Sequence, residues 1–446
     1  MDTLCSRMLL FLCLAPLMTL AAPPPPTHQF TLQNGLKVLV REDHRAPLAT
    51  SQLRFQVGSA DEAPGQTGLS HALEHMLYKG SSKTCAGEAA AILDTLGARH
   101  NALTSKDATV YYQTLAPKYL GVAFELMADL MSTAHLRDSD LVPEMAVIRE
   151  ERRLRIDDDN HSLAQERLQS VAHLASSYRT PIIGWMHDLH RLNAENLRQW
   201  YHLHYVPGNA TLVVVGDVTV DQVKTLAERY FGPLATRPAP RLLRPTELAA
   251  PGERKLKLYL PVPAPQLILA FNVPGLVTAQ NPRSAHALRL LNILLGGTNS
   301  SPLQKRLRYA DQVFSEIDTS YAYLTRGDSL LTVTAVLAGT HANDIDAAEA
   351  RIWKIIEELR TTAPAPEELE RARTQLIAKQ VYAQDSIMAQ ANRLATLESI
   401  GLSWQSMDRD ADELAQVTPT DIQQAAERYL TRERVSVAHV LKKVAP

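Results

Sequence analysis

Cysteine is scarce in this chain of 446 residues. Cys5 and Cys13 lie within the first twenty residues, and Cys85 is the third and last cysteine. If the N-terminal segment is removed, no intrachain disulfide can form, so the fold must depend on its core rather than on covalent cross-links. A lone cysteine is more often a small buried hydrophobe than a nucleophile, and we expect this of Cys85.

The sequence also lacks an excess of charge of either sign. Its 46 basic residues nearly balance 48 acidic ones, and neither kind forms a long run. Binding to nucleic acid needs a concentrated basic surface, so no nucleic-acid partner is expected. Hydrophobic residues make up 45% of the chain and charged residues 21%, which excludes a disordered or fibrous protein and allows two domains of ordinary size.

Long apolar runs are absent beyond the N-terminus, where a membrane span would need about 20 residues. The run from Met8 to Leu20 is shorter and contains Pro16, and it lies between Arg7 and the small residue Ala21. This pattern predicts a signal peptide, residues 1–21, and hence a secreted or periplasmic protein. Retention of the segment as a membrane anchor is the less favoured alternative, and no stable span is expected in the mature chain.

A proline-rich stretch, residues 236–253, has no apolar periodicity and indicates a linker. It separates an N-terminal domain, residues 27–235, from a C-terminal domain, residues 254–446. The two parts repeat one pattern, in which alternating and apolar strands precede a helix and a final helix precedes a β-branched strand. The central helix opens with the same tripeptide in both parts, at His71 and at His286. We therefore predict a duplicated α+β fold, a clam-like pair of homologous domains, each a mixed sheet with helices on one side.

The helix predicted around residues 69–78 has two faces. Its apolar residues recur at helical spacing, whereas His71, Glu74 and His75 share the opposite face. Two imidazoles at positions i and i+4 lie about 6 Å apart and can bind one metal ion. Zinc suits such a site, because imidazole and carboxylate are its usual catalytic ligands.

A third protein ligand is expected from a helix beginning at Pro143. Glu144 and Glu151 are seven residues apart and lie on one face of it. Glu151 would complete the metal site, and Glu144 would hydrogen-bond a ligating histidine. Glu150 points elsewhere and is the next candidate. Glu74 is not needed as a ligand, so its carboxylate is free to act as the general base that deprotonates an attacking water and later protonates the leaving amine.

These residues resemble a known family. His71-Ala72-Leu73-Glu74-His75 matches the inverted zinc motif of the inverzincins, and the chain is similar over both halves to the pitrilysin family, in particular its short branch that resembles the mitochondrial processing peptidase. In that branch a ligating glutamate follows the second histidine at the distance of Glu151, and a supporting glutamate precedes it at the distance of Glu144. The resemblance implies one Zn²⁺ per chain and a zinc metalloendopeptidase.

The resemblance also implies how substrate would bind. Asn101 and Thr104 lie in a segment that would form an edge strand pairing with an extended peptide. The second copy changes the zinc motif, because Arg289 and Leu290 stand at the positions of Glu74 and His75, so only the first domain is expected to hold metal. The isolated histidines at 187, 190, 202 and 204 fit no metal-binding spacing and are taken as surface or packing residues.

Family members carry an Arg and a Tyr in the second half that bind the substrate carbonyl. Here Arg308 matches the Arg, but Phe314 stands where the Tyr is expected, and a phenyl ring cannot donate a hydrogen bond. Either Tyr309, Tyr321 or Tyr323 replaces it, or another polypeptide supplies the donors. We favour the second alternative, a heterodimer with a metal-free homologous subunit or a homodimer.

Two other functions compete with an endopeptidase acting on peptides or unfolded polypeptides. One is a catalytically silent peptide-binding or scaffold subunit of the same fold, which the intact motif at His71 to His75 disfavours. The other is a zinc hydrolase of a different bond, such as an amidase, which the expected peptide-binding edge strand disfavours weakly.

Overall fold

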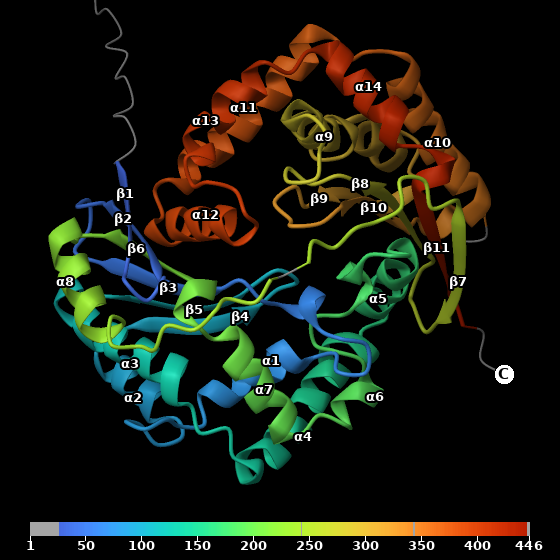
Figure 1. Cartoon of the computed structure of the whole chain (residues 1–446). Coiled ribbons are helices and arrows are strands. Elements are labelled where there is room, and N and C mark those ends of the chain that lie inside the picture. The colour runs from blue at the N-terminus through green and yellow to red at the C-terminus, as the bar shows by residue number, and fades with distance from the viewer. Residues whose placement is uncertain (1–25, 242, 342–343, 444–446) are drawn as a thin grey trace, which may run out of the picture.

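The computed structural model describes residues 26–241, 243–341 and 344–443, which form two sheets surrounded by helices (Figure 1). The predicted signal peptide, residues 1–21, lies outside these residues. Within the described part of the chain, no helix is both long enough and apolar enough to cross a membrane.

The first half contains a six-stranded mixed sheet in the order β1-β2-β6-β3-β5-β4. Its strands are β1 (Thr27–Thr31), β2 (Lys37–Glu42), β3 (Ala49–Phe55), β4 (Arg99–Thr104), β5 (Thr109–Leu115) and β6 (Ala210–Gly216). β2 and β6 run parallel, and the other neighbours are antiparallel. β4 pairs only with β5 in the described sheet, so the strand containing Asn101 and Thr104 is an edge, as predicted.

The second half repeats this arrangement with five strands in the order β7-β11-β8-β10-β9. They are β7 (Arg254–Leu260), β8 (Gln266–Val273), β9 (Phe314–Tyr321), β10 (Ser329–Leu337) and β11 (Val435–Lys442). β7 and β11 run parallel, and the remaining pairs are antiparallel. This order matches β2-β6-β3-β5-β4 strand for strand, which confirms the predicted duplicated α+β fold.

The helices follow the same duplication. Those of the first half are α1 (Leu69–Leu77), α2 (Glu88–Thr95), α3 (Leu120–Thr133), α4 (Asp138–Arg152), α5 (Asn160–Ala172), α6 (Met186–Leu189), α7 (Ala194–His204) and α8 (Val220–Tyr230). Those of the second half are α9 (Pro282–Leu295), α10 (Ile345–Thr361), α11 (Pro366–Ala383), α12 (Ile387–Ser399), α13 (Ser406–Ala415) and α14 (Pro419–Tyr429). By position in the chain, α9 corresponds to α1, α11 to α4 and α12 to α5.

One helix of each half packs against the sheet of the other half. In Figure 1, α12 lies on the face of the first sheet opposite α1 and α3, and α5 lies beside β11. Leu394 of α12 is buried in one cluster with Val213 and Val215 of β6, and Leu168 of α5 is buried in one cluster with Ile268 of β8. The expectation of helices on only one side of each sheet is therefore wrong.

This exchange explains the composition of the central strands. β6 and β8 are buried along their whole lengths, because helices cover both faces of the sheet there. Such strands consist of almost continuous apolar runs, whereas β10 alternates between buried and half-buried residues. The predicted linker, residues 236–253, joins α8 to β7, and its described residues form no helix or strand.

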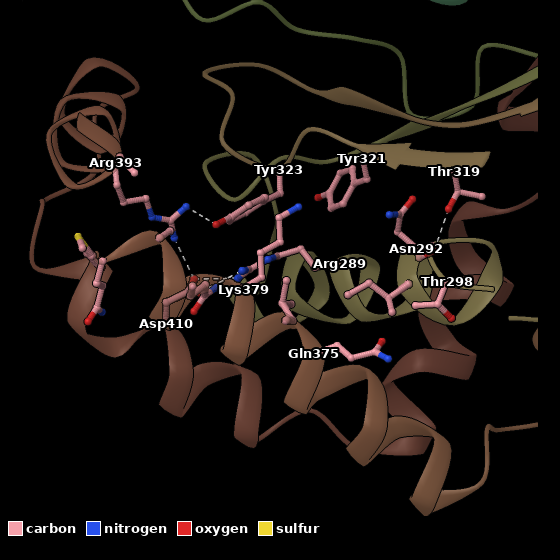
Figure 2. Close-up of a pocket in the computed structure, with 18 of the residues that line it drawn as sticks. Arg289, Asn292, Thr298, Thr319, Tyr321, Tyr323, Gln375, Lys379, Arg393 and Asp410 are labelled. Atoms are coloured by element: carbon pink, nitrogen blue, oxygen red, sulfur yellow. Dashed lines mark hydrogen bonds and ion pairs between the residues drawn. The ribbon is translucent and has the colours of Figure 1, made fainter. Parts of the chain in front are cut away.

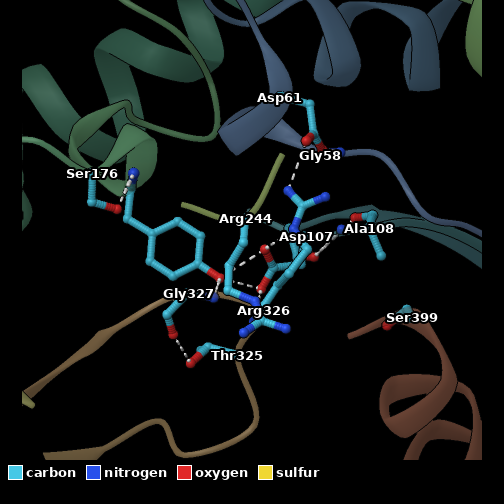
Figure 3. Close-up of polar contacts among 12 residues, drawn as sticks. Gly58, Asp61, Asp107, Ala108, Ser176, Arg244, Thr325, Arg326, Gly327 and Ser399 are labelled. Carbon is cyan, nitrogen blue, oxygen red and sulfur yellow. Dashed lines mark hydrogen bonds and ion pairs between the residues drawn. The ribbon is translucent and has the colours of Figure 1, made fainter. Parts of the chain in front are cut away.

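A buried polar cluster also joins the two halves (Figure 3). Arg326, in the loop between β9 and β10, donates through Nη2 to Asp61 Oδ1 at 2.7 Å and through its backbone N–H to Asp107 Oδ2 at 3.1 Å. The Tyr178 hydroxyl donates to Asp107 and accepts from the backbone N–H of Gly327 at 2.9 Å. Burial raises the pKa of Asp61, and the charge of Arg326 opposes this shift. The guanidinium therefore compensates two carboxylates that are largely shielded from water.

Arg326→Ala should destabilise the protein by about 3–5 kcal/mol, because removing one partner leaves buried carboxylates unpaired. Arg306→Ala is the matched control, since Arg306 forms only a half-exposed ion pair with Glu358 and such pairs contribute about 0–1 kcal/mol. Denaturant unfolding of the three proteins measures the difference. Equal stability of Arg326→Ala and the unmodified protein would show that the cluster does not hold the halves together.

Candidate metal centre

Helix α1 carries the histidines, and its start is fixed by glycine. Gly68 precedes α1 with φ of 87°, and a Cβ there would lie 2.6 Å from the carbonyl oxygen of Ile183. Only glycine tolerates both the left-handed backbone and this close approach. Four apolar residues of α1 are buried in the core, namely Leu69, Leu73, Met76 and Leu77. Their packing sets the orientation of the opposite face of the helix, which carries the histidines.

The carboxylate of Glu62 caps the first turn of α1. Its two oxygens accept the backbone N–H groups of Gly68 and Ser70, each at 2.7 Å. Burial raises the pKa of Glu62 to about 8, against the effect of these hydrogen bonds. The side chain of Glu62 thus pairs two backbone N–H groups at the start of α1. His71 follows directly in the same helical turn.

Glu151 faces both histidines from α4. Its Oε2 lies 3.4 Å from His75 Nε2 and 3.7 Å from His71 Nε2, and Arg155 holds its other oxygen at 2.8 Å. Two ligand atoms bound to one tetrahedral zinc ion are about 3.4 Å apart, so these three side chains fit a zinc ion. The structure thus brings together His71, His75 and Glu151, as predicted, although α4 begins at Asp138 and not at Pro143, which lies inside the helix.

Glu144 orients His75. Its Oε1 lies 2.8 Å from His75 Nδ1, and Lys79 Nζ lies 2.5 Å from its Oε2. Burial disfavours the carboxylate, but the hydrogen bonds from Lys79 and His75 outweigh it, and the pKa of Glu144 falls below its usual value. An ionised Glu144 accepts a hydrogen bond from the Nδ1–H group of His75, so Nε2, which faces Glu151, carries the lone pair that is available to a metal.

His71 is kept neutral. Burial, reinforced by His75 and by Arg155, lowers the pKa of its imidazole to about 3. Its Nδ1 is buried and has no hydrogen-bond partner among the described residues. A metal ligand must offer an unprotonated nitrogen, so this environment suits the role.

Glu74 lies on the same face of α1 but outside the ligand cluster. It accepts a hydrogen bond from the Thr104 hydroxyl, at the end of β4. Burial raises the pKa of its carboxyl group, and the hydrogen bond opposes this shift. A raised pKa moves a carboxylate toward the range in which it exchanges protons efficiently near neutral pH.

The other predicted substrate-binding residues are not part of this cluster. Asn101 lies on β4, where its side-chain oxygen accepts from the backbone N–H of Ala102 at 2.9 Å. Arg308 lies in a π-helix, Leu303–Ala310, and donates to Gln304 at 3.3 Å. Phe314 is only 1% exposed, because it packs in the core of the second half.

Several contributors were not anticipated. Arg155 follows its partner Glu151 by four positions, a spacing from which a helical contact could have been predicted, whereas Lys79 pairs with Glu144 of another helix. Glu62 lies in a loop and Asp188 in the four-residue helix α6, so no periodicity points to them, although Asp188 accepts from Thr67 beside the start of α1 at 2.6 Å. Cys85 is exposed, so the expectation of a buried residue is wrong.

The described residues contain one other group with metal-ligating atoms, namely Asp346, Glu349 and His439. Glu349 accepts from Trp353 Nε1 at 3.1 Å and pairs with Arg432 at 3.1 Å and His439 at 2.8 Å. Its charge is already compensated, so this group is a structural ion-pair network. The isolated histidines at 187, 190, 202 and 204 join neither group.

Comparison with known proteins agrees with this geometry. A family profile described as "Insulinase (Peptidase family M16)" matches residues 37–184, and one described as "Peptidase M16 inactive domain" matches residues 191–376. The zinc protease PqqE of Helicobacter pylori is 31% identical over 302 residues, which are 65% of this chain and 66% of that protein. An uncharacterised zinc protease of Bacillus subtilis, YmxG, is 25% identical over 91% of this chain and 96% of its own. The crystal structure of a protease from Helicobacter pylori superposes with a TM-score of 0.87 at 25% identity, over 93% of this chain and 99% of that one.

Proposed function

This chain belongs to peptidase family M16, the pitrilysin family of zinc metallopeptidases, and we propose that it is a zinc-dependent endopeptidase that hydrolyses peptides or unfolded polypeptides in the periplasm. The observation that carries the proposal is the convergence of His71, His75 and Glu151 beside the half-buried carboxylate of Glu74. The periplasmic location rests on the predicted signal peptide alone.

His71, His75 and Glu151 would hold one zinc ion, with Glu144 orienting His75. When bound, the ion would polarise the scissile carbonyl and lower the pKa of a water molecule to about 7. Glu74 takes a proton from the attacking water and returns it to the departing amine, so the peptide bond breaks without a net change in the enzyme. Thr104 holds the Glu74 carboxylate in position through its hydroxyl.

The free edge of β4 offers a place for the substrate backbone. Ala102 and Thr104 are buried, and Thr104 contacts Glu74 of α1, whereas Leu103 is 61% exposed on the alternate face. An extended peptide that adds to this edge forms main-chain hydrogen bonds and is bound largely without regard to its side chains. This mode of binding favours a peptide as the substrate over a small amide, which has no extended backbone to pair with β4.

A library of unstructured peptides tests the proposal. The purified protein should cleave internal bonds, as identified by mass spectrometry of the products, and a chelator should stop the cleavage. The competing scaffold role predicts no cleavage under any metal supply. Cleavage that continues at full rate after complete removal of metal would exclude a zinc mechanism.

Glu144→Gln should weaken zinc affinity by about 10–100-fold, because it removes the charged acceptor that fixes the ring of His75. Competition with a zinc-binding dye measures the affinity. Glu125→Gln is the matched control, since Glu125 forms an ion pair with Lys83 at the surface. Unchanged affinity in Glu144→Gln would mean that helix α1 alone orients His75.

We further propose that the full activity requires a partner, either a metal-free homologue or a second copy of the chain. Phe314 cannot donate to the substrate carbonyl, and Tyr321 already donates to the carbonyl of Pro274 at 2.6 Å. Donors at that position are worth about 3 kcal/mol or more in the transition state. High activity of the isolated chain that is lost in Tyr309→Phe would refute the partner and identify Tyr309 as the donor. A large gain on co-expression with a metal-free homologue is the expected result.

A further inference from the structure

A cavity of about 710 Å³ lies in the second half, between α9, α11, α12 and the end of β9 (Figure 2). Helices α9 and α11 correspond to α1 and α4, so the cavity occupies the position that the metal centre occupies in the first half. Its third wall, α12, rests on the first sheet, where Asn392 Oδ1 accepts from Gln52 Nε2 at 2.9 Å. One wall of the cavity is therefore in contact with the first half, although all residues that line it belong to the second.

The chemistry at this position differs between the copies. His286 is retained from the repeated tripeptide, but Arg289 stands in place of the base Glu74, and α11 brings Lys379 where α4 brings glutamates. In the first half a bound metal ion would supply positive charge at this position. In the second half the side chains of Arg289 and Lys379 supply it.

The positive charge of the lining exceeds its negative charge. Arg289 forms a two-point pair with Asp410 at 2.8 and 3.0 Å, and Arg393 Nη2 approaches the same carboxylate at 3.3 Å. Asp410 is the only acidic residue among those that line the described cavity, whereas the basic residues are Arg289, Arg393 and Lys379. Figure 2 shows Arg393 and Asp410 at one end of the cavity and Asn292 and Thr319 at the other.

Several hydrogen-bonding groups near these basic side chains have no partner among the described residues. Tyr323 accepts from Arg393 Nη1, which leaves its own hydroxyl proton free to be donated. Asn292 Oδ1 and Gln390 Oε1 are buried acceptors without a partner in the described chain, and Gln390 is only 2% exposed. Buried acceptors of this kind cost free energy unless a ligand supplies N–H groups.

We propose that this cavity binds a carboxylate-bearing segment of a peptide. The carboxylate would lie against Lys379, Arg393 and the Tyr323 hydroxyl, and peptide N–H groups would donate to Asn292 and Gln390. A simple inorganic anion would satisfy the cations but not the unpaired acceptors. The proposal rests on the proposed endopeptidase function, since it assigns this cavity to the same substrates.

Helix α12, which lines the cavity, rests on the sheet that ends in the edge strand β4. Gln52, which contacts α12, pairs across β3 and β5 with Tyr112, and Tyr112 pairs with Asn101 on the edge strand β4. Two strand spacings separate them, about 10 Å, and an extended peptide covers about 3.3 Å per residue. Binding of a carboxylate in the cavity would thus anchor a substrate that also extends to the edge strand β4.

Binding of one labelled peptide in several forms tests this proposal by fluorescence anisotropy, with zinc-loaded full-length Glu74→Gln protein so that no cleavage occurs. The forms are the free C-terminal acid, the C-terminal amide, and amides with one internal Glu or Gln. A carboxylate should strengthen binding by about tenfold, the effect of one charge-assisted hydrogen bond. A preference for the free acid identifies the chain terminus as the ligand, and a preference for Glu over Gln identifies a side chain.

Lys379→Gln and Arg393→Gln should each remove this preference, whereas Lys354→Gln, at an exposed position of α10 outside the cavity, should retain it. Lys379 is exposed, so its replacement should leave the fold intact. Equal binding of all peptide forms, or a preference that survives both cavity variants, would overturn the proposal. Cleavage of the amide by unmodified protein separately tests the endopeptidase function, so the two failures are distinguishable.

Discussion

Glu74→Gln should reduce peptide hydrolysis by at least about 100-fold while leaving about one zinc ion per chain. The substitution removes the proton acceptor, but His71, His75 and Glu151 keep their ligand atoms. Thr104 can still hydrogen-bond the amide, so the geometry of α1 and β4 should persist. Initial rates on a quenched fluorescent peptide and metal analysis of the same sample give the two results.

Glu88→Gln is a suitable control, because Glu88 lies exposed at the start of α2 and accepts only from the backbone N–H of Cys85. It should keep full activity. Substantial turnover in zinc-replete Glu74→Gln would show that another group accepts the proton.

Glu151→Gln and His75→Ala should lose zinc and activity together. Each substitution removes one of the three protein ligands. The fourth position of a catalytic zinc site is open to water or substrate, so no other protein ligand can compensate. The remaining two ligands would bind zinc too weakly to retain it through purification. Zinc content and hydrolysis measured on one preparation should therefore fall in parallel.

Glu150→Gln is the matched control for this pair. Glu150 precedes Glu151 in the same helix, but it is exposed and forms an ion pair with Arg153 at 2.5 Å. It should retain both zinc and activity. Equal zinc content in Glu151→Gln and the unmodified protein would place the third ligand elsewhere.

Part of the candidate metal centre could be predicted from the sequence because the geometry within each helix is local. Helical periodicity alone places His71 and His75 on one face, and the seven-residue spacing of Glu144 and Glu151 places both on one side of α4. The contacts of these residues then follow from packing one helix against another.

The exchange of α5 and α12 could not be predicted in this way. The apolar residues of α12 indicate that the helix has a partner, but they do not specify which sheet it covers. Leu394 would be buried equally well on either sheet, and only the path of the whole chain decides. The cavity beside α12 shares this limitation, because its lining comes from elements far apart in the sequence.

The start of α4 shows a smaller error with a clear cause. Proline favours the first turn of a helix, which made Pro143 a reasonable first residue. The structure places it five residues inside, where it costs the helix one backbone hydrogen bond. Glu62 escaped prediction because a cap from a preceding loop leaves no periodic signal.

Reconstitution with zinc tests the central claim most directly. Purified protein stripped with a chelator should be inactive toward peptides, and activity should return in proportion to added zinc until one equivalent per chain is bound. Glu74→Gln should bind the same single equivalent and remain inactive. Peptide cleavage by the metal-free protein, or the absence of stoichiometric zinc binding, would contradict the assignment of this chain as a zinc endopeptidase.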